Sequence, residues 1–320
     1  MNIQTKSPEA IALLEEKLHI NCNYGPWWTA RKLLVDCWKK NPKVIRDTAC
    51  DLRDLPFSEA GRDIQWRRPV TRDMIGKYVH HVDKNSQYLA ADRSVYTGIG
   101  DPTYISGNVT PGRPGIYHLA SVSIADSCMF DGEYFPRIIE EGQEWITNDV
   151  LLFARKQGYA FEVTEAYVFE DYKRVLETWA LRIWNARSAL KGANDEAYQF
   201  MKLVAIVGNG GWAASREKVE SFEMIHPNWW ADTVGQARVA LLANLAKYGS
   251  PVLVETDGLY YVSSYAYPET ALPGILDRST QLGGYKHCSS FHLTEELYNS
   301  SQNMGVGELA RAFKVAGGEK

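Results

Sequence analysis

The sequence lacks the features of a membrane or secreted protein. None of its apolar runs approaches the roughly 20 residues that a membrane-spanning helix needs. The N-terminal stretch MNIQTKSPEAIALLEEKLH has acids within its apolar part, which is not typical of a secretion signal. The five cysteines form no C-x-x-C pair, so we expect reduced thiols in a cytoplasmic protein that has no membrane partner.

A strong net charge is also missing. The formal net charge is -4, which argues mildly against nucleic-acid binding. Residues 31–80, however, hold twelve lysines and arginines against seven acids. Because the local field matters more than the total charge for binding phosphates, this segment is a candidate contact for nucleic acid. A solvated helical face explains any single one of these charges equally well.

Internal repeats and low-complexity segments are absent as well, and the composition, 45% hydrophobic over 320 residues, suffices for one large packed domain or two modest ones. Apolar periodicity predicts helices over 8–20, 27–40, 147–159, 171–190, 196–207 and 228–249, and strands over 78–83, 116–124 and 160–170. Residues 98–115, rich in glycine and proline, predict a loop, and 251–264 predict a strand, a turn and a second strand. This order favours the α+β class, with an antiparallel sheet, helices on one face and a projecting helical hairpin.

Three acids stand at the ends of predicted strands. Asp83 ends YVHHVD, and Glu255 and Asp257 occupy the tip of VLVETDGLYYV. Residues i and i+2 of a strand point the same way, so we expect Glu255 and Asp257 to share one face. If the two strands are neighbours, Asp83 and Asp257 converge, and converging carboxylates repel unless a cation lies between them. Two magnesium ions about 3.5–4 Å apart would activate a hydroxyl and stabilise a leaving pyrophosphate.

Three short motifs place these acids in a larger pattern. DKNSQY, residues 83–88, has the form D-x-x-S-x-Y, and ETDGLYYV, residues 255–262, is close to D-T-D-S. KLVAIVGNGGW, residues 202–212, lies between them, where a helix K-x-x-x-N-S-x-Y-G would be expected. In this order they resemble motifs A, C and B of family B DNA polymerases. Residues 144–170, 229–257 and 281–291 resemble the connecting segments of that family, so the resemblance covers roughly 78–292.

The resemblance implies a role for each matching position. Asp83, Asp257 and the carbonyl of Lys84 would bind the metal ions, with Glu255 as a less direct catalytic acid. Tyr88 would be the steric gate that clashes with a 2′-hydroxyl. Cationic groups would neutralise the triphosphate, since positioning and charge neutralisation are most of phosphoryl-transfer catalysis. The nucleotide-binding positions would be Tyr88, Ser86, Arg182, Arg187, Lys191, Lys202 and Gly210.

The resemblance also implies cofactor, partners and organisation. It implies a DNA-directed DNA polymerase that uses Mg²⁺, or Mn²⁺, and that takes deoxynucleotides and a primer-template DNA. The chain would comprise an N-terminal helical, basic region (1–77), a first palm part (78–170), fingers (171–212), a second palm part (213–292) and a short tail or remnant thumb (293–320). Residues 1–77 are too few for the proofreading exonuclease of the family. The small size is typical of a polymerase from a mobile replicon. A replication partner protein is therefore a further candidate partner.

The chain departs from the family at several positions, which leaves alternatives open. Of motif B only Lys202 and Gly210 remain, and Asn209 stands where the family has tyrosine. Glu255 replaces an aspartate, and Gly258 a serine. One alternative is therefore a catalytically degenerate palm protein that binds DNA or replicon ends without synthesis. A carbohydrate enzyme is a distant third, because i, i+2 acids on one hairpin make a poor acid–nucleophile pair across a sugar.

Two further signals have simpler explanations. His287, Cys288 and His292 could ligand zinc, but their spacing is unusual and a fourth ligand is missing, so we favour structural histidines. The stretch GNGGW could form a phosphate-binding loop, but it lacks the flanking strand and helix of such loops.

Overall fold

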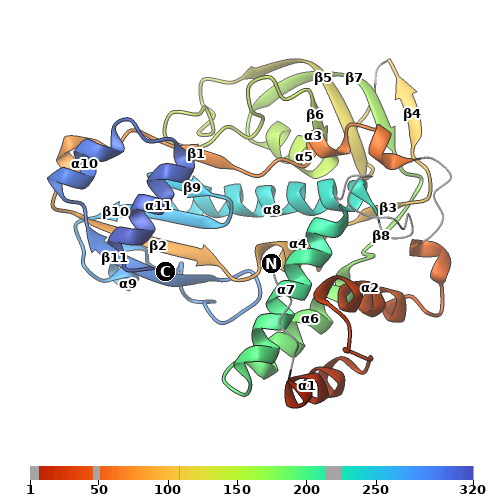
Figure 1. Ribbon diagram of the computed structural model, residues 1–320. Helices are drawn as coiled ribbons and strands as arrows, with labels where there is room; N and C mark the ends of the chain where they lie inside the picture. Colours follow the sequence, from red (N-terminus) through yellow and green to blue (C-terminus); the bar gives the residue numbers. More distant parts are fainter. Residues whose placement is uncertain (1–6, 46–50, 108, 213–224, 320) are drawn as a thin grey trace.

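The computed structural model describes residues 7–45, 51–107, 109–212 and 225–319, which form an α+β fold with antiparallel sheets, as predicted (Figure 1). The central sheet has five strands in the order β1 (Gln65–Arg67), β9 (Leu253–Glu255), β10 (Gly258–Ser263), β2 (Tyr78–Lys84) and β11 (Tyr285–His292). Strands remote in sequence therefore lie side by side, with β2 between β10 and β11. Among the described helices, none is both long and apolar enough to cross a membrane.

Helices cover both faces of the central sheet, so the expectation of helices on one face is wrong. On one face α8 (Pro227–Tyr248) shares an apolar cluster with Val82. On the other, α11 (Val306–Ala316) shares a cluster with Val79, through side chains such as Phe313 (Figure 1). Val79 and Val82 thus point to opposite faces of β2, and each packs into an apolar cluster. A strand that is buried on both faces needs a covering layer on each of them. The second cover comes from α11, within the residues 293–320 that the sequence predicts only as a short tail or remnant thumb.

A second sheet and a two-stranded ribbon lie beyond α8. The second sheet has the order β4 (Thr103–Ser106), β7 (Tyr159–Val168), β5 (Gly115–Ile124) and β6 (Trp145–Thr147), followed in the chain by α5 (Asn148–Lys156). The ribbon pairs β3 (Thr97–Ile99) with β8 (Asp171–Lys173). The predictions of a loop over 98–115 and of a helix beginning at 171 are therefore wrong in these stretches. These short strands depend on partners far away in the sequence, which local composition does not show.

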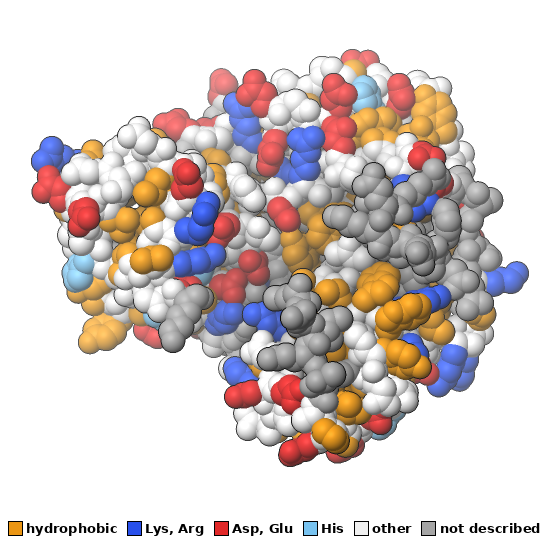
Figure 2. All heavy atoms as spheres, in the orientation of Figure 1, with side chains coloured by type: hydrophobic (Ala, Val, Ile, Leu, Met, Phe, Trp, Pro, Cys, Tyr) orange, Lys and Arg blue, Asp and Glu red, His pale blue; other side chains and the backbone are white. Residues whose placement is uncertain are grey.

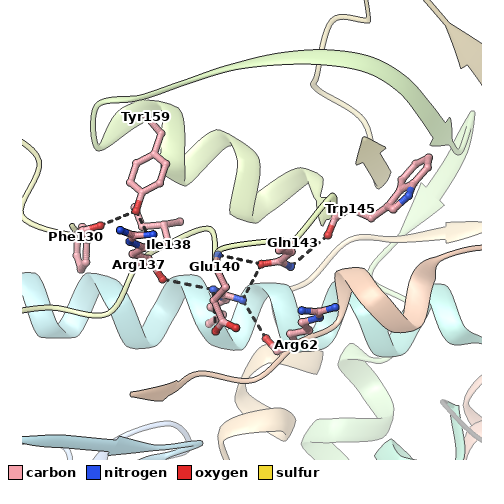
Figure 3. Close-up of polar contacts among 9 residues, drawn as sticks. Arg62, Phe130, Arg137, Ile138, Glu140, Gln143, Trp145 and Tyr159 are labelled. Atoms are coloured by element: carbon pink, nitrogen blue, oxygen red, sulfur yellow. Dashed lines mark hydrogen bonds and ion pairs between the residues drawn. The ribbon is translucent and has the colours of Figure 1, made fainter. Parts of the chain in front are cut away.

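Arg238 of α8 holds the irregular segment between β5 and β6 in place. Figure 3 labels its partners Arg62, Arg137, Glu140 and Gln143. Arg238 is 3% exposed. It donates to the carbonyls of Arg62 and Arg137 at 3.4 Å each, and to side-chain oxygens of Glu140 and Gln143 at 3.5 Å each. A buried cation needs such partners, so this arginine ties the segment to α8 and to the chain before β1.

The helices α6 (Glu177–Leu190) and α7 (Asp195–Trp212) form a helical hairpin that projects from the sheets (Figure 1). Its apolar side packs on α1 (Pro8–Leu18) and α2 (Pro26–Cys37). Of the described elements within residues 7–77, α1 and α2 pack on the hairpin, whereas β1 pairs with β9 of the central sheet. The predicted boundary between 212 and 213 borders residues 213–224, which lie outside the described residues.

The remaining described elements are short. They are α3 (Phe57–Ala60), α4 (Gln87–Asp92), α9 (Pro268–Ala271), α10 (Glu295–Ser301) and three 3-10 turns at Pro42–Ile45, Leu52–Asp54 and Arg72–Met74.

The glycines of GNGGW belong to the last turns of α7 and not to a loop. A Cβ on Gly208 would come within 2.5 Å of the Trp179 ring, and one on Gly211 within 1.7 Å of the Trp27 ring. A Cβ on Gly210, by contrast, would meet nothing within 4 Å. Two of the three glycines are therefore explained by close packing against tryptophans, which offsets their low helix propensity.

Candidate functional site

The central sheet brings Asp83 and Asp257 together. Asp83, on β2, is paired with Gly258 of β10 on one side and with Lys286 of β11 on the other. Asp257 directly precedes β10, and its carbonyl accepts a hydrogen bond from the amide of Lys84 at 3.2 Å. The prediction that acids from two remote strands converge is confirmed by this register.

The pair of acids is electrostatically coupled. Burial raises the pKa of Asp257 to about 7, and the charge of Asp83 and a hydrogen bond to it add to this effect. The Lys286 ammonium lies 2.6 Å from Asp83 Oδ2 and opposes the rise. Lys286, which sequence patterns do not single out, is therefore a cation that pairs with one of these carboxylates and acts electrostatically on the other. Its register opposite Asp83 is set by strand pairing.

Strained backbone flanks both acids. Ser86 and Thr256 have φ values of 51° and 57°, in the left-handed region that non-glycine residues seldom adopt. Each such residue costs on the order of 1 kcal/mol, and such strain tends to gather at functional sites. At Ser86 the hydroxyl accepts a hydrogen bond from Arg187, which helps to hold the turn.

The left-handed Thr256 also separates Glu255 from Asp257. Strand β9 ends at Glu255, so the i, i+2 rule for a continuous strand does not apply across the turn. The Glu255 carboxylate pairs with Lys314 of α11 at 2.7 Å, whereas Asp257 interacts with Asp83. The two carboxylates thus have different partners and do not follow the expectation that they share one face, which also weakens the carbohydrate-enzyme alternative, in which they would be paired acids.

A pocket of about 330 Å³ opens beside the acids, below the α6–α7 hairpin. In the space-filling view, acidic and basic side chains lie side by side where the face is hollowed between the central sheet and this hairpin (Figure 2). Most of the predicted site residues line it: Asp83, Lys84, Ser86, Tyr88, Arg187, Lys202 and Asp257. Six lining residues were not predicted: Gln87, Leu89, Ala205, Ile206, Asn209 and Lys286.

Tyr88 is held rigidly in the wall of this pocket. Its hydroxyl donates a hydrogen bond to Asp63 Oδ1 at 2.6 Å, and its ring packs on Trp230 with centroids 5.4 Å apart. Burial, together with the charge of Asp63, raises the pKa of Tyr88, and burial raises the pKa of Asp63. Asp63 lies 25 residues earlier, in the basic segment, and no sequence signal distinguished it from its neighbours.

The predicted cations divide into two groups. Arg187 and Lys202 line the pocket, and Lys191 lines an adjoining cavity of about 300 Å³ together with Arg187 and Lys286. Arg182 does not reach either cavity, because its guanidinium pairs with Asp36 of α2 at 2.6 Å. Its assignment to nucleotide binding is therefore corrected to a tie between α6 and the N-terminal helices.

Gly210 does not line the pocket either, although its neighbour Asn209 does. The side chain of Lys84 is 5% exposed, and burial lowers its pKa to about 8. Several cations of the basic segment, residues 31–80, are engaged in ion pairs away from the pocket. These pairs join Lys39 to Asp36, Arg53 to Asp51, Arg72 to Glu295 and Lys77 to Asp73.

A buried carboxyl group lies directly behind the pocket. Asp92, at the end of α4, accepts a hydrogen bond from Thr233 Oγ1 of α8 at 2.7 Å, and Asn209 of α7 lies against it. Burial raises the pKa of Asp92 to about 7. Asp92 Oδ2 and Asn209 Oδ1 are both buried and have no hydrogen-bond partner in the described part of the chain. If the Asp92 carboxyl is protonated, its O–H can donate to Asn209 Oδ1, which gives both oxygens a partner.

The acid pair offers what a hard divalent cation prefers. Two carboxyl groups in contact, one of them buried and with a pKa raised by burial and by its neighbour, form an oxygen donor set whose repulsion a bound cation would relieve. The residues present therefore fit magnesium, with Lys286 as the competing positive charge on Asp83.

No protein-family model and no curated protein sequence matches the chain. Solved structures do: the orthorhombic crystal form of phi29 DNA polymerase matches with a TM-score of 0.63 at 16% identity, over 89% of this chain and 55% of that one. The post-translocation binary complex of the same polymerase with primer-template DNA gives 0.62 at 16% identity, with 89% and 55% covered. Its ternary complex with incoming nucleotide gives 0.60 at 15% identity, with 88% and 55% covered. The chain thus spans about half the length of these polymerases, and over that span it has the fold of phi29 DNA polymerase, a family B polymerase.

Proposed function

We propose that the chain is a DNA-directed DNA polymerase that adds deoxynucleotides to a primer by a two-metal mechanism. The observation that carries the proposal is the meeting of Asp83 and Asp257 at a pocket whose other walls hold Tyr88, Arg187 and Lys202. Acids for metal ions, cations for a triphosphate and an aromatic ring for the sugar are the parts that phosphoryl transfer to a 3′ end requires.

In this proposal residues 78–170 and 213–292 act as the palm, and residues 171–212 act as the fingers. Asp83, Asp257 and the carbonyl of Lys84 would hold Mg²⁺ or Mn²⁺. The bound ions would activate the primer hydroxyl and neutralise the leaving pyrophosphate. Lys202, Arg187 and Lys191 would bind the triphosphate, and Tyr88, fixed by Asp63, would exclude a 2′-hydroxyl.

Lys286 would exchange partners during this cycle. Its side chain is 46% exposed and pairs with Asp83 through one long, flexible stem. When a divalent ion and a nucleotide enter, the ammonium is free to leave the carboxylate and contact a phosphate. The acid pair therefore never has to remain without a positive charge nearby.

The solved structures support the choice of partners. Phi29 DNA polymerase is found in complexes with primer-template DNA and with incoming nucleotides. The pocket of this chain has the charges that such ligands need. Because only about half of that polymerase is covered, the thumb and any further contacts would come from additional chain or from a replication partner protein.

Primer extension with Mg²⁺ or Mn²⁺ tests the proposal. The parent chain is expected to extend a primer with deoxynucleotides, and both Asp83→Asn and Asp257→Asn to reduce extension to background while leaving the circular dichroism spectrum unchanged. Asp126→Asn, which changes an exposed acid of a turn, is the matched control. Extension that survives in both site variants would refute the metal assignment.

A second candidate is a polymerase-like protein that binds DNA without synthesis. It is favoured by Asn209, which lines the pocket where the family has a tyrosine, so the ring that packs near the incoming base is missing. In this case labelled DNA would bind with a steep salt dependence, yet no nucleotide would be incorporated with any primer or metal.

A further inference from the structure

A cluster of three metal-ligating side chains lies outside the pocket, on the α11 side of the central sheet. A ring nitrogen of His81, the thiol of Cys288 and a carboxylate oxygen of Glu319 all lie within 4.8 Å of one another. They come from β2, from β11 and from the chain that follows α11. We propose that these three residues bind one transition-metal ion of the zinc class.

His81 and Glu319 are already oriented toward each other. His81 Nδ1 lies 2.7 Å from Glu319 Oε1, and the His81 ring stacks on Tyr260 with centroids 4.2 Å apart and planes 3° apart. The hydroxyl of Ser289 donates a second hydrogen bond to the same carboxylate. Stacking fixes the ring and the hydroxyl fixes the carboxylate, as outer groups do around metal ligands in proteins.

A β-bulge delivers the third ligand. In the pairing of β11 with β2, His287 faces Val82 and Ser289 faces His81, so Cys288 is the extra residue. A bulge of this kind changes the direction of a side chain. The bulge brings the Cys288 thiol to within 4.8 Å of the ligand atoms of His81 and Glu319.

The chain after α11 approaches β11 closely enough to hold this arrangement. A Cβ on Gly317 would come within 2.4 Å of Ser289 Oγ, so only glycine permits the approach at this point. Two residues later Glu319 reaches His81, whose side chain is 5% exposed. The cluster is therefore built from packed segments and does not depend on a free tail.

The donor set selects the kind of ion. In a tetrahedral zinc site the ligand atoms lie about 3.3–3.6 Å apart, so shifts of about 1 Å in the Cys288 and Glu319 side chains would close the site. Imidazole and thiolate favour Zn²⁺ over Mg²⁺, which distinguishes this cluster from the oxygen-only acid pair two residues away on β2. Three protein ligands leave the fourth position for water.

Metal titration of the full chain tests the proposal independently of polymerase activity. After removal of metals with a chelator, the chain is titrated with Zn²⁺ in excess Mg²⁺ and, separately, with Co²⁺. We expect about one Zn²⁺ per chain, a rise in Tm on binding, and a thiolate-to-cobalt charge-transfer band. Cys288→Ser should abolish the band, and Cys288→Ser and Glu319→Gln should each weaken Zn²⁺ binding at least about tenfold.

The controls separate this cluster from the alternatives. His287→Gln and His292→Gln should leave binding unchanged, because His287 faces Ser290 and His292 faces the carbonyl of Gly76. Loss of Zn²⁺ in these two variants, or its retention in both Cys288→Ser and Glu319→Gln, would overturn the assignment. So would the absence of Zn²⁺ binding to the parent chain in excess Mg²⁺. The test uses no substitution of His81, because a change at so buried a side chain could prevent folding. Glu319→Gln changes a more exposed ligand of the same cluster and decides the question in its place.

Discussion

Replacing the buried Asp92 by asparagine should change how the stability of the chain depends on pH. An asparagine keeps the shape of a protonated aspartate, accepts the hydrogen bond of Thr233 and can donate to Asn209. Unlike aspartate, it carries no charge at any pH. The variant therefore removes the cost of ionising this group between α4, α7 and α8 while preserving its contacts.

The size and sign of the effect follow from the two pKa values. In the folded chain the pKa of Asp92 is about 7, and the ordinary value is 3.8. Below pH 3.8 both states are protonated, and between 3.8 and 7 only the unfolded chain ionises, so the unfolding free energy falls as pH rises through this window. Each pH unit is worth about 1.4 kcal/mol, so Asp92→Asn is expected to be more stable than the parent by up to about 4 kcal/mol above pH 7, and about equally stable near pH 4.

Urea unfolding at several pH values, followed by tryptophan fluorescence, measures this difference. Other groups that titrate in the same window, such as Asp257, cancel when the variant is subtracted from the parent at each pH. Asp126→Asn, which changes an exposed acid, provides the matched control. A constant difference between Asp92→Asn and the parent from pH 4 to pH 8 would refute the reasoning.

Four further substitutions test the site and its support. Lys286→Met should raise the pKa of Asp257 and move the acid limb of primer extension to higher pH, and an unmoved limb would show that this lysine does not act on that acid. Asp63→Asn should loosen the tyrosine it binds and increase ribonucleotide incorporation relative to deoxynucleotide incorporation; an unchanged ratio would separate it from sugar selection. Glu255→Gln should leave extension intact, because its carboxylate pairs with a lysine of α11, and a loss as large as in the aspartate variants would return it to the metal site. Gly211→Ala should lower the unfolding free energy by about 1–3 kcal/mol through its clash with a tryptophan ring, whereas Gly210→Ala, with open space, should not; equal effects would contradict the packing explanation.

The sequence determined the parts that depend on local pattern. The α+β class, the helices α5, α7 and α8, and the strands β2 and β10 follow from apolar periods of 3.6 and 2, which neighbouring residues fix by themselves. The convergence of Asp83 and Asp257 could also be expected, because two motifs of known order constrain which strands pair. Short strands such as β4 and β8 were missed, since their stability comes from distant partners.

Only the tertiary structure decided which side chains meet around the acid pair. The left-handed Thr256 sends Glu255 to Lys314, strand register sets Lys286 against Asp83, and a bulge gives Cys288 its neighbours. These outcomes depend on backbone conformation at single residues and on pairing between segments far apart in the chain, neither of which residue spacing encodes. The sequence thus determined which chemistry-bearing residues the chain has, and strand register, the turn at Thr256 and the packing of α11 against the sheet decided which of them act together.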